Sequence, residues 1–254
     1  MFLFELADLG AGFKKYFEVV PALTDELRDH VFRIRHEVYC AELNYEPVRP
    51  NQRETDDYDA QSLHCLIRSV HDGEYVGCTR LVLTRASDPG ALLPVEKTCA
   101  KTIDRSIADL QRLPRHSIAE ISRLAVISRY RSRRDEHKSP ATITDESFGT
   151  KERPRFPYLT AGLYLATIEL ARLHNIATLV VLSEPRLARH LRTLGVDIQR
   201  IGGPVEHRGT RVPSMMTVGG ILDGLNVLVR PLYSVVAEEV ASGMRAQRAA
   251  ALQR

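Results

Sequence analysis

The segment AEISRLAV, residues 119–126, carries a carboxylate, a hydroxyl and a guanidinium in an apolar stretch that predicts a core strand. Burial disfavours the charged form of a carboxyl group, which raises its pKa toward the range in which it serves as a general base. Glu120 is therefore a candidate base, with Ser122 and Arg123 as candidate catalytic partners. A regular strand sends Glu120 and Arg123 to opposite faces, so they share one pocket only if the strand is bulged or bent. A purely structural ion-pair strand is the alternative.

Charged residues elsewhere in the chain have types and positions that suit such a pocket. Strand alternation places Arg80 on the same face as apolar neighbours, and a buried arginine needs a partner. Arg35 lies on a helical stripe that alternates cations with aromatics, which is also typical of a solvated helix edge with snorkelling arginines. The loop ETDDYD, residues 54–59, offers Asp56 and Asp59 as partners for both arginines. It lacks the glycine and distal glutamate of a calcium loop, so a metal site is not predicted.

A cationic run follows the AEISRLAV strand. The stretch SRYRSRRDEHK, residues 128–138, suits a phosphate group or an acidic protein surface, although display to solvent is the simpler interpretation. No aromatic stacking pattern accompanies it, so nucleic acid is not an expected partner. The candidate donor-binding residues in this run are Arg129, Arg131, Arg133 and Arg134.

Composition sets the general class of the protein. The chain has 254 residues, 44% hydrophobic and 26% charged, with a net charge of +3, which is ordinary for a globular protein. The four cysteines show no C-x-x-C pair and are expected to be reduced core residues. The N-terminus lacks the basic region of a signal peptide, and no apolar run reaches about 18 residues. We therefore expect a cytoplasmic protein without stable membrane insertion.

The predicted elements alternate between strands and helices, which favours a single α/β domain over residues 1–254 with a mixed sheet. Thr24 is a plausible cap for a helix that extends to residue 43, and Asp-Gly at 72–73 predicts a hairpin. The polar stretch 135–157 is expected to be a flexible insertion. The remaining expectations are hairpin strands at 62–70 and 75–84, a helix at 158–174, a strand at 176–184, a helix at 185–195, strands at 196–202 and 214–219, and a C-terminal helix at about 220–250.

Taken in order, these residues resemble a known family. The ordered set is Arg35, Tyr39, Tyr45, Asp56, Asp59, Gly77, Arg80, Leu81, Thr84, Glu120, Ser122 and Arg123. Over roughly residues 25–215 it resembles the acyl-homoserine-lactone (autoinducer) synthases among the GNAT-type acyltransferases. It is similar in particular to N-acyl amino acid synthases and to acyltransferases associated with PEP-CTERM/exosortase systems. The resemblance implies a GNAT fold: a central mixed, mostly antiparallel sheet flanked by helices, with a C-terminal helical extension.

The resemblance also implies a function, which is transfer of a long-chain fatty acyl group from acyl carrier protein to the amine of an amino acid or similar small acceptor. No tightly bound cofactor is implied; acyl carrier protein, or acyl-coenzyme A, is the co-substrate. Glu120, Arg123 and Ser122 would be catalytic. The acceptor and lid network would comprise Arg35, Tyr39, Tyr45, Asp56, Asp59 and Arg80, and the arginines of residues 129–134 would bind the donor.

Two departures from the family pattern refine these expectations. Tyr45 stands where autoinducer synthases have tryptophan, which argues against lactone formation from S-adenosylmethionine. Ser132 and Arg134 stand where a phosphate-binding loop would have glycines, so a side-chain clamp is expected in place of a backbone cradle. Two alternative functions remain: a coenzyme A-dependent N-acetyltransferase of the same fold, and a non-catalytic sensor of acyl ligands.

Overall fold

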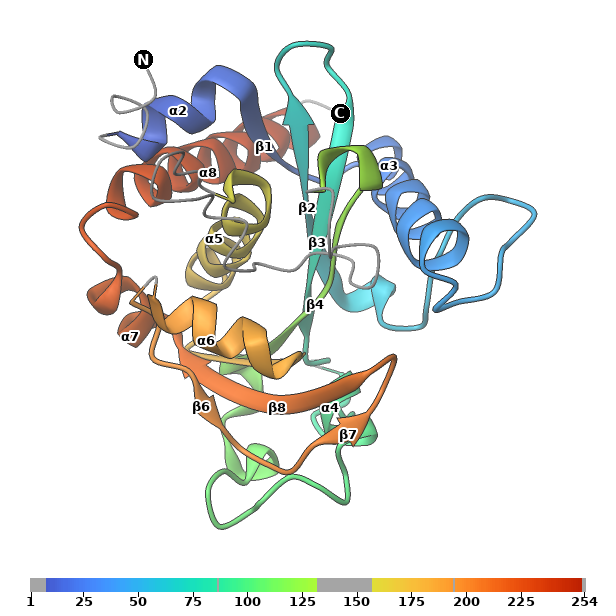
Figure 1. Cartoon of the computed structure of the whole chain (residues 1–254), viewed down its shortest axis with the longest axis vertical. Helices are drawn as coiled ribbons and strands as arrows, with labels where there is room; N and C mark the ends of the chain where they lie inside the picture. Colours follow the sequence, from blue (N-terminus) through green and yellow to red (C-terminus); the bar gives the residue numbers. More distant parts are fainter. Residues whose placement is uncertain (1–7, 86, 132–156, 194, 253–254) are drawn as a thin grey trace.

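The computed structural model describes residues 8–85, 87–131, 157–193 and 195–252. An eight-stranded sheet crosses the molecule in the order β1-β2-β3-β4-β5-β8-β6, with β7 paired to β8 (Figure 1). Neighbouring strands are antiparallel except β4 and β5, which are parallel. The strands are β1 (Phe17–Pro21), β2 (Ser62–Ser69), β3 (Tyr75–Leu83), β4 (Ile118–Val126), β5 (Thr178–Ser183), β6 (Gln199–Arg200), β7 (Val205–Glu206) and β8 (Thr210–Thr217).

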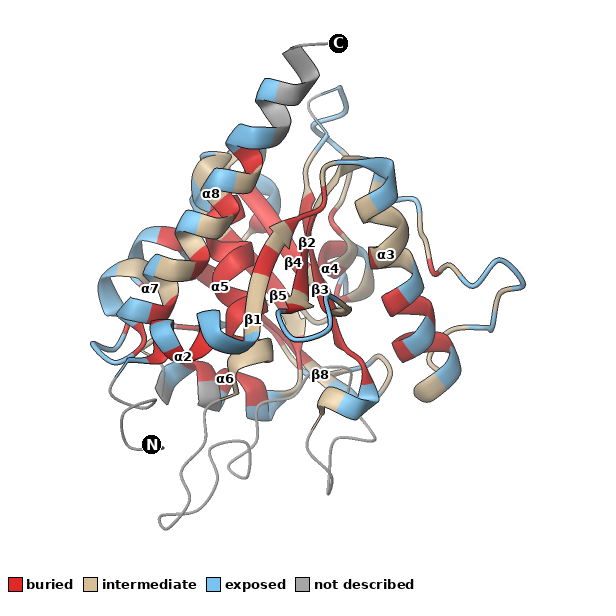
Figure 2. Ribbon diagram, turned by 90° about the horizontal axis from the view of Figure 1, so that it is seen from above, coloured by how far each residue is buried: buried red, intermediate tan, exposed pale blue. Residues whose placement is uncertain are grey.

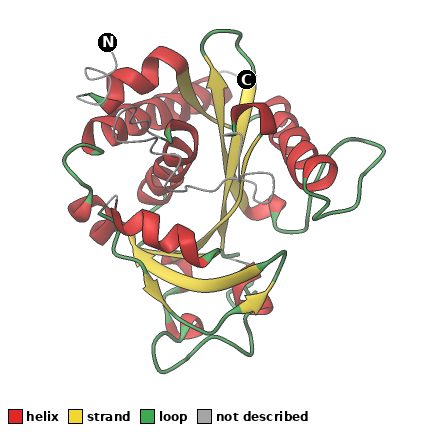
Figure 3. Ribbon diagram, in the orientation of Figure 1, coloured by secondary structure: helices red, strands yellow, loops and turns green. Residues whose placement is uncertain are grey.

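Helices cover both faces of this sheet (Figures 2 and 3). The helices α2 (Leu9–Tyr16), α5 (Tyr158–Leu173) and α8 (Arg230–Leu252) pack on one face, where α5 is buried along most of its length. Helix α3 (Asp25–Arg35) packs on the other face and continues as a π-helix, His36–Glu42. The shorter helices are α4 (Pro94–Thr98), α6 (Pro185–Thr193), α7 (Val218–Gly224) and the 3₁₀ turns Asp59–Gln61, Leu110–Arg112, Arg115–Ser117 and Ser128–Tyr130.

The sequence explains why these elements form. Thr24 caps α3 because its hydroxyl accepts a hydrogen bond from the Leu27 N–H at 3.2 Å. Gly77 faces α5, where a Cβ would lie 2.9 Å from the carbonyl oxygen of Ala125, so its lack of a side chain allows this close approach. The hairpin at 62–84, the helix at 158–174, the strand at 176–184 and the helix starting at Pro185 are all confirmed.

The structure corrects other expectations. The helix predicted to reach residue 43 changes to π geometry after Arg35. The C-terminal helix is two helices, α7 and α8, because residues 225–229 turn between them. The strand predicted at 196–202 is reduced to Gln199–Arg200, whereas β8 begins earlier than expected, at Thr210. The predicted insertion at 135–157 lies outside the described residues except for Pro157.

The four cysteines are free and buried, as expected for reduced core residues. Across the described residues, no helix combines the length and apolar character needed to cross a bilayer.

Candidate active site

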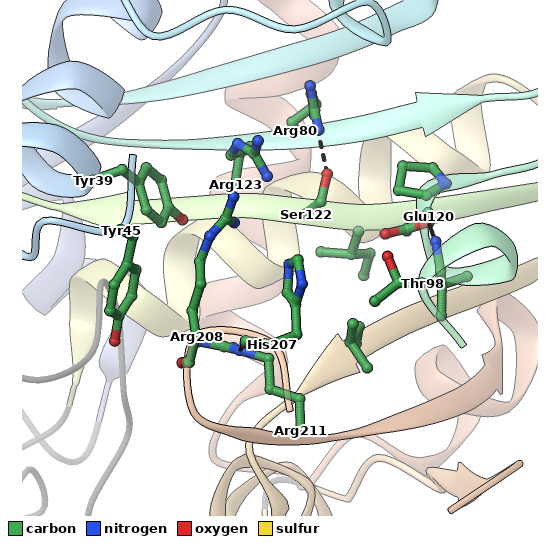
Figure 4. A pocket seen from close by; sticks show the side chains of 14 residues that line it. Tyr39, Tyr45, Arg80, Thr98, Glu120, Ser122, Arg123, His207, Arg208 and Arg211 are labelled. Carbon is green, nitrogen blue, oxygen red and sulfur yellow. Dashed lines mark hydrogen bonds between the residues drawn. The ribbon is translucent and has the colours of Figure 1, made fainter. Parts of the chain in front are cut away.

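A cavity opens where β4 and β5 part. Their parallel pairing ends at Ile121 opposite Val181, although β4 continues to Val126. The cavity has a volume of about 100 Å³ and is lined by the π-helix and the loop after it, α4, both strands, and the hairpin that joins β7 to β8. Its lining residues are Tyr39, Tyr45, Arg80, Pro94, Val95, Thr98, Glu120, Ile121, Ser122, Arg123, Leu182, His207, Arg208 and Arg211 (Figure 4).

A β-bulge in β4 brings the predicted catalytic residues together. Cys78 pairs with Ala125 and Arg80 pairs with Ser122, so β4 has two residues, Arg123 and Leu124, where β3 has one. Arg123 takes a left-handed conformation with φ of 51°. Glu120, Ser122 and Arg123 therefore all line the cavity, which meets the condition that the strand be bulged.

The predicted network of arginines and aspartates is also present. Asp56 accepts hydrogen bonds from Arg80 Nη1 at 2.6 Å and from Arg123 Nη2 at 3.1 Å. Asp59 accepts hydrogen bonds from Arg35 Nη1 at 2.6 Å and from Arg80 Nη1 at 2.8 Å, and so links the two arginines. Arg80 Nε also donates to the Ser122 hydroxyl at 3.0 Å. Arg35, Asp56 and Asp59 lie behind the cavity wall and do not line it.

Sequence reasoning missed Glu54, which completes this network. Glu54 is 1% exposed and accepts hydrogen bonds from Arg35 Nε and from Arg123 Nε, the latter at 3.3 Å. Burial alone would raise the pKa of Glu54, but Arg35 and Arg123 lower it below its ordinary value. Burial alone would also lower the pKa of Arg35, yet Glu54 and Asp59 raise it. Three arginines thus balance three carboxylates, and the pKa of each of these carboxyl groups is lowered below its ordinary value.

Glu120 differs from these carboxylates because the network does not pair it with an arginine. It is 3% exposed, and Oε2 accepts a hydrogen bond of 2.7 Å from the Val95 N–H of α4. Burial raises the pKa of Glu120 to about 8, against the smaller opposing effects of that hydrogen bond and of Arg80 and Arg123. A carboxyl group that exchanges its proton near neutral pH is suited to general acid–base chemistry.

The two predicted tyrosines lie together at one end of the cavity. Tyr39 is in the π-helix, a geometry that often accompanies functional sites, and its hydroxyl donates to the carbonyl of Leu124 in the bulge at 3.0 Å. The Arg123 guanidinium lies 5.7 Å from the centre of the Tyr39 ring, in cation–π range. Tyr45 lies 6.4 Å from Tyr39, ring centre to ring centre.

The hairpin between β7 and β8 contributes three further lining residues that sequence reasoning did not select. His207, Arg208 and Arg211 face the bulge of β4 across the cavity (Figure 4). No local pattern in the sequence singles out these side chains. Burial, and then Arg211 and Arg123, lower the pKa of His207, so the imidazole is neutral at pH 7.

The arginines predicted to bind the acyl donor are not part of the cavity lining in the described residues. Arg129 and Arg131 follow the end of β4, where Arg129 pairs with Glu74 and Arg131 pairs with Glu42. Neither lines the cavity. Arg133 and Arg134 lie outside the described residues. Within the described part of the chain, no group of three or more His, Cys, Asp or Glu side chains is placed to hold a metal ion.

Comparisons with known proteins agree with this geometry. Residues 34–137 match the family described as acetyltransferase (GNAT) domain. The fold is similar to that of TofI, solved in a ternary complex with an inhibitor and MTA, with a TM-score of 0.55 and 18% identity over 80% of this chain and 96% of that chain. It is similar to the CoA-dependent acyl-homoserine lactone synthase BjaI, solved with SAM and isopentyl-CoA, with a TM-score of 0.55 and 20% identity over 85% and 89%.

A third similar structure is FeeM, an N-acyl amino acid synthase from uncultured soil microbes, with a TM-score of 0.54 and 14% identity over 84% of this chain and 96% of that chain. Among curated proteins, no significant match to this chain is found. This chain therefore has the GNAT fold expected from the sequence, and the matched domain over residues 34–137 supports an acyltransferase activity. The architecture of the chain is that of autoinducer synthases and of FeeM.

Proposed function

We propose that this protein is an N-acyltransferase that moves a fatty acyl group from an acyl carrier protein thioester to the amine of an amino acid or similar small acceptor. The observation that carries the proposal is the bulge of β4, which places Glu120 and Arg123 in one cavity at the point where β4 and β5 part. An extended acyl thioester can enter between separated strands, and the cavity then presents the acceptor to its carbonyl carbon.

The proposed reaction is a direct transfer. The acceptor's amine attacks the thioester carbonyl, the C–N bond forms, and Glu120 takes the proton from nitrogen directly or through a water. The C–S bond then breaks, and the departing thiolate takes that proton, which leaves Glu120 ready for the next cycle. Because the pKa of Glu120 is raised to about 8, the carboxyl group both accepts and returns a proton readily near neutral pH.

The network behind the cavity has a positioning role in this proposal. Arg123 is fixed by Glu54 and Asp56, so its guanidinium cannot swing away from the strand. Backbone N–H groups of β4 beyond Ile121, where pairing with β5 has ended, are the candidate donors to the tetrahedral oxyanion. All four cysteines are buried away from solvent, which supports transfer without a cysteinyl intermediate.

The donor proposal rests on the cationic run after β4. A carrier protein presents an acidic surface, and Arg129 and Arg131 after the end of β4 would meet it. Arg129 and Arg131 already pair with glutamates, so docking would require them to exchange partners. BjaI is a CoA-dependent acyl-homoserine lactone synthase, and acyl-coenzyme A is therefore the second donor to test.

The deciding experiment is mass spectrometry of the protein incubated with long-chain acyl carrier proteins or acyl-coenzyme A, together with pooled amino acids and S-adenosylmethionine. We expect N-acyl amino acids from the carrier-protein donor, and their loss in Glu120→Gln. Glu96→Gln is the control for loss of a buried carboxylate outside the cavity, since Glu96 also accepts a backbone N–H at the start of α4 but pairs with Arg115 and does not line the cavity.

Each other outcome identifies a different function. Product from acyl-coenzyme A alone would establish a coenzyme A-dependent transferase, and acetyl transfer alone an N-acetyltransferase. Absence of product from every donor with folded protein would refute the proposal in favour of an acyl-binding sensor.

A further inference from the structure

The hairpin between β7 and β8 holds two arginines against the cavity by contacts of its own. Arg211 Nε donates to the carbonyl of His207 at 2.8 Å, across the turn. Arg208 and Gly209 at the tip take left-handed conformations, with φ of 56° and 92°. The Gly209 N–H donates to Glu206 at 2.9 Å. The turn is therefore held in one shape, and its cationic side chains are placed before any ligand arrives.

The carboxylates around the cavity balance its arginines unequally. Four arginines and one glutamate line it in the described part of the chain. Arg80 pairs with Asp56 and Asp59. Arg123 pairs with Glu54 and Asp56, and Arg208 pairs with Glu46.

Arg211 differs from these three because, among the described residues, its side chain donates hydrogen bonds to the backbone carbonyls of His207 and Arg208 and to no carboxylate. Among the described residues its carboxylate partner is Glu184, with the oxygen 3.8 Å from Nη2, beyond hydrogen-bond distance. The Arg211 side chain is only 14% exposed, so solvent does little to screen this cation. The wall of the cavity opposite β4 is therefore lined by two cations, whose partner carboxylates Glu46 and Glu184 lie outside the lining.

We infer that Arg211, assisted by Arg208, binds the carboxylate of the acceptor, so that the substrate class is amino acids and not simple amines. This inference rests on the proposed function. A guanidinium presents parallel N–H donors that match the two oxygens of a carboxylate. Glu120 and the hairpin lie on different walls of one small cavity, so a molecule with amine and carboxylate close together reaches both (Figure 4).

The wall lined by these two cations also favours the reactive form of the acceptor. Cations near an ammonium group disfavour its charged form and lower its pKa, whereas the bound carboxylate supplies the affinity. An amine without an acid group meets the unfavourable charge and lacks the attraction. Discrimination against such amines is therefore built into the wall, independently of the rest of the acceptor.

The test compares acceptors that differ only in the acid group. Wild type, Arg211→Gln, Arg211→Lys and Arg208→Gln are assayed with L-amino acids and with the corresponding amino acid amides, using the carrier-protein donor. We expect Arg211→Gln to raise KM for amino acids roughly 10- to 100-fold, as for loss of a charge-assisted hydrogen bond, and to lower KM for the amides, because the unfavourable charge is removed. Arg211→Lys should recover part of the loss. Arg200→Gln is the matched control, because Arg200 is exposed on β6 outside the cavity.

A binding experiment separates this inference from the proposed function. Calorimetric titration with N-decanoyl amino acids and with their carboxamides needs no turnover. We expect the acids to bind wild type more tightly than the carboxamides, and Arg211→Gln to remove that preference. Equal binding of acid and carboxamide would overturn the inference even if acyl transfer occurs. A rise in KM for the donor alone would overturn it too, since the cation would then serve the phosphate of pantetheine.

Discussion

Replacing Glu120 by glutamine should change how stability depends on pH, and the size of the change follows from burial. The ordinary pKa of a glutamate is 4.5, whereas burial raises that of Glu120 to about 8. The unfolded chain therefore releases this proton near pH 4.5 and the folded protein near pH 8. Between these values unfolding releases a proton, so this residue makes the free energy of unfolding fall as pH rises.

The magnitude is large enough to measure. Each tenfold difference in proton affinity corresponds to about 1.4 kcal/mol, so Glu120 costs the folded state roughly 5 kcal/mol of stability at pH 8 and above, relative to pH 4.5 and below. Glutamine has nearly the same shape, does not titrate, and keeps an oxygen that accepts the Val95 N–H. Glu120→Gln should therefore match wild type near pH 5 and become progressively more stable than wild type toward pH 8.

Urea denaturation of both proteins at a series of pH values from 5 to 9 provides the assay. The difference between their free energies of unfolding should grow by about 1.4 kcal/mol per pH unit below pH 8 and then level off. Groups common to both proteins cancel in this difference. Parallel stability curves would refute the reasoning, because they would mean that Glu120 ionises normally in the folded protein and is not a carboxyl group poised near neutral pH.

Four further predictions follow from the same contacts. The kcat/KM of acyl transfer should rise with pH up to about 8 in wild type, following ionisation of Glu120, and a profile flat from pH 6 to 8 would contradict that role. Glu54→Gln should lower the free energy of unfolding by roughly 3 to 5 kcal/mol, whereas Glu74→Gln, in an exposed pair, should cost about 0 to 1 kcal/mol by the same urea titration. Tyr39→Phe should cost about 1 kcal/mol for its hydrogen bond to β4, and an unchanged stability would mean that this bond contributes nothing. The four buried cysteines should react with a thiol reagent only after unfolding, and fast labelling of the native protein, followed by absorbance, would contradict their burial.

The sequence was sufficient for features that depend on neighbouring residues. Alternation along β3 placed Arg80 on a buried face, and the Asp-Gly turn located the hairpin. Regular alternation would send Glu120 and Arg123 to opposite faces, so the sequence stated the condition for a shared pocket, a bulged or bent strand, and the structure meets that condition. Local patterns succeed here because strand geometry fixes which way each side chain points.

Features that depend on contacts between distant segments were not predictable in this way. Glu54 lies in a polar loop whose neighbours include three aspartates, and nothing local separates it from them. One signal was available in the sequence. If Arg35, Arg80 and Arg123 are all buried, they need three carboxylates, and Asp56 and Asp59 supply only two. The hairpin at 205–211 reaches the cavity only because β8 lies beside β5, a pairing that no local pattern specifies.

The bulge in β4 has a consequence for how this cavity could arise or be lost. Deleting Arg123 would keep Ser122 opposite Arg80 and bring Leu124 opposite Thr79, which is the pairing of an uninterrupted ladder. The strands on either side would need no change of register. Insertion or deletion of one codon, that of Arg123, thus separates a regular β3–β4 ladder from the bulged one that carries this guanidinium. The fold can therefore be kept while the guanidinium of the cavity is gained or lost.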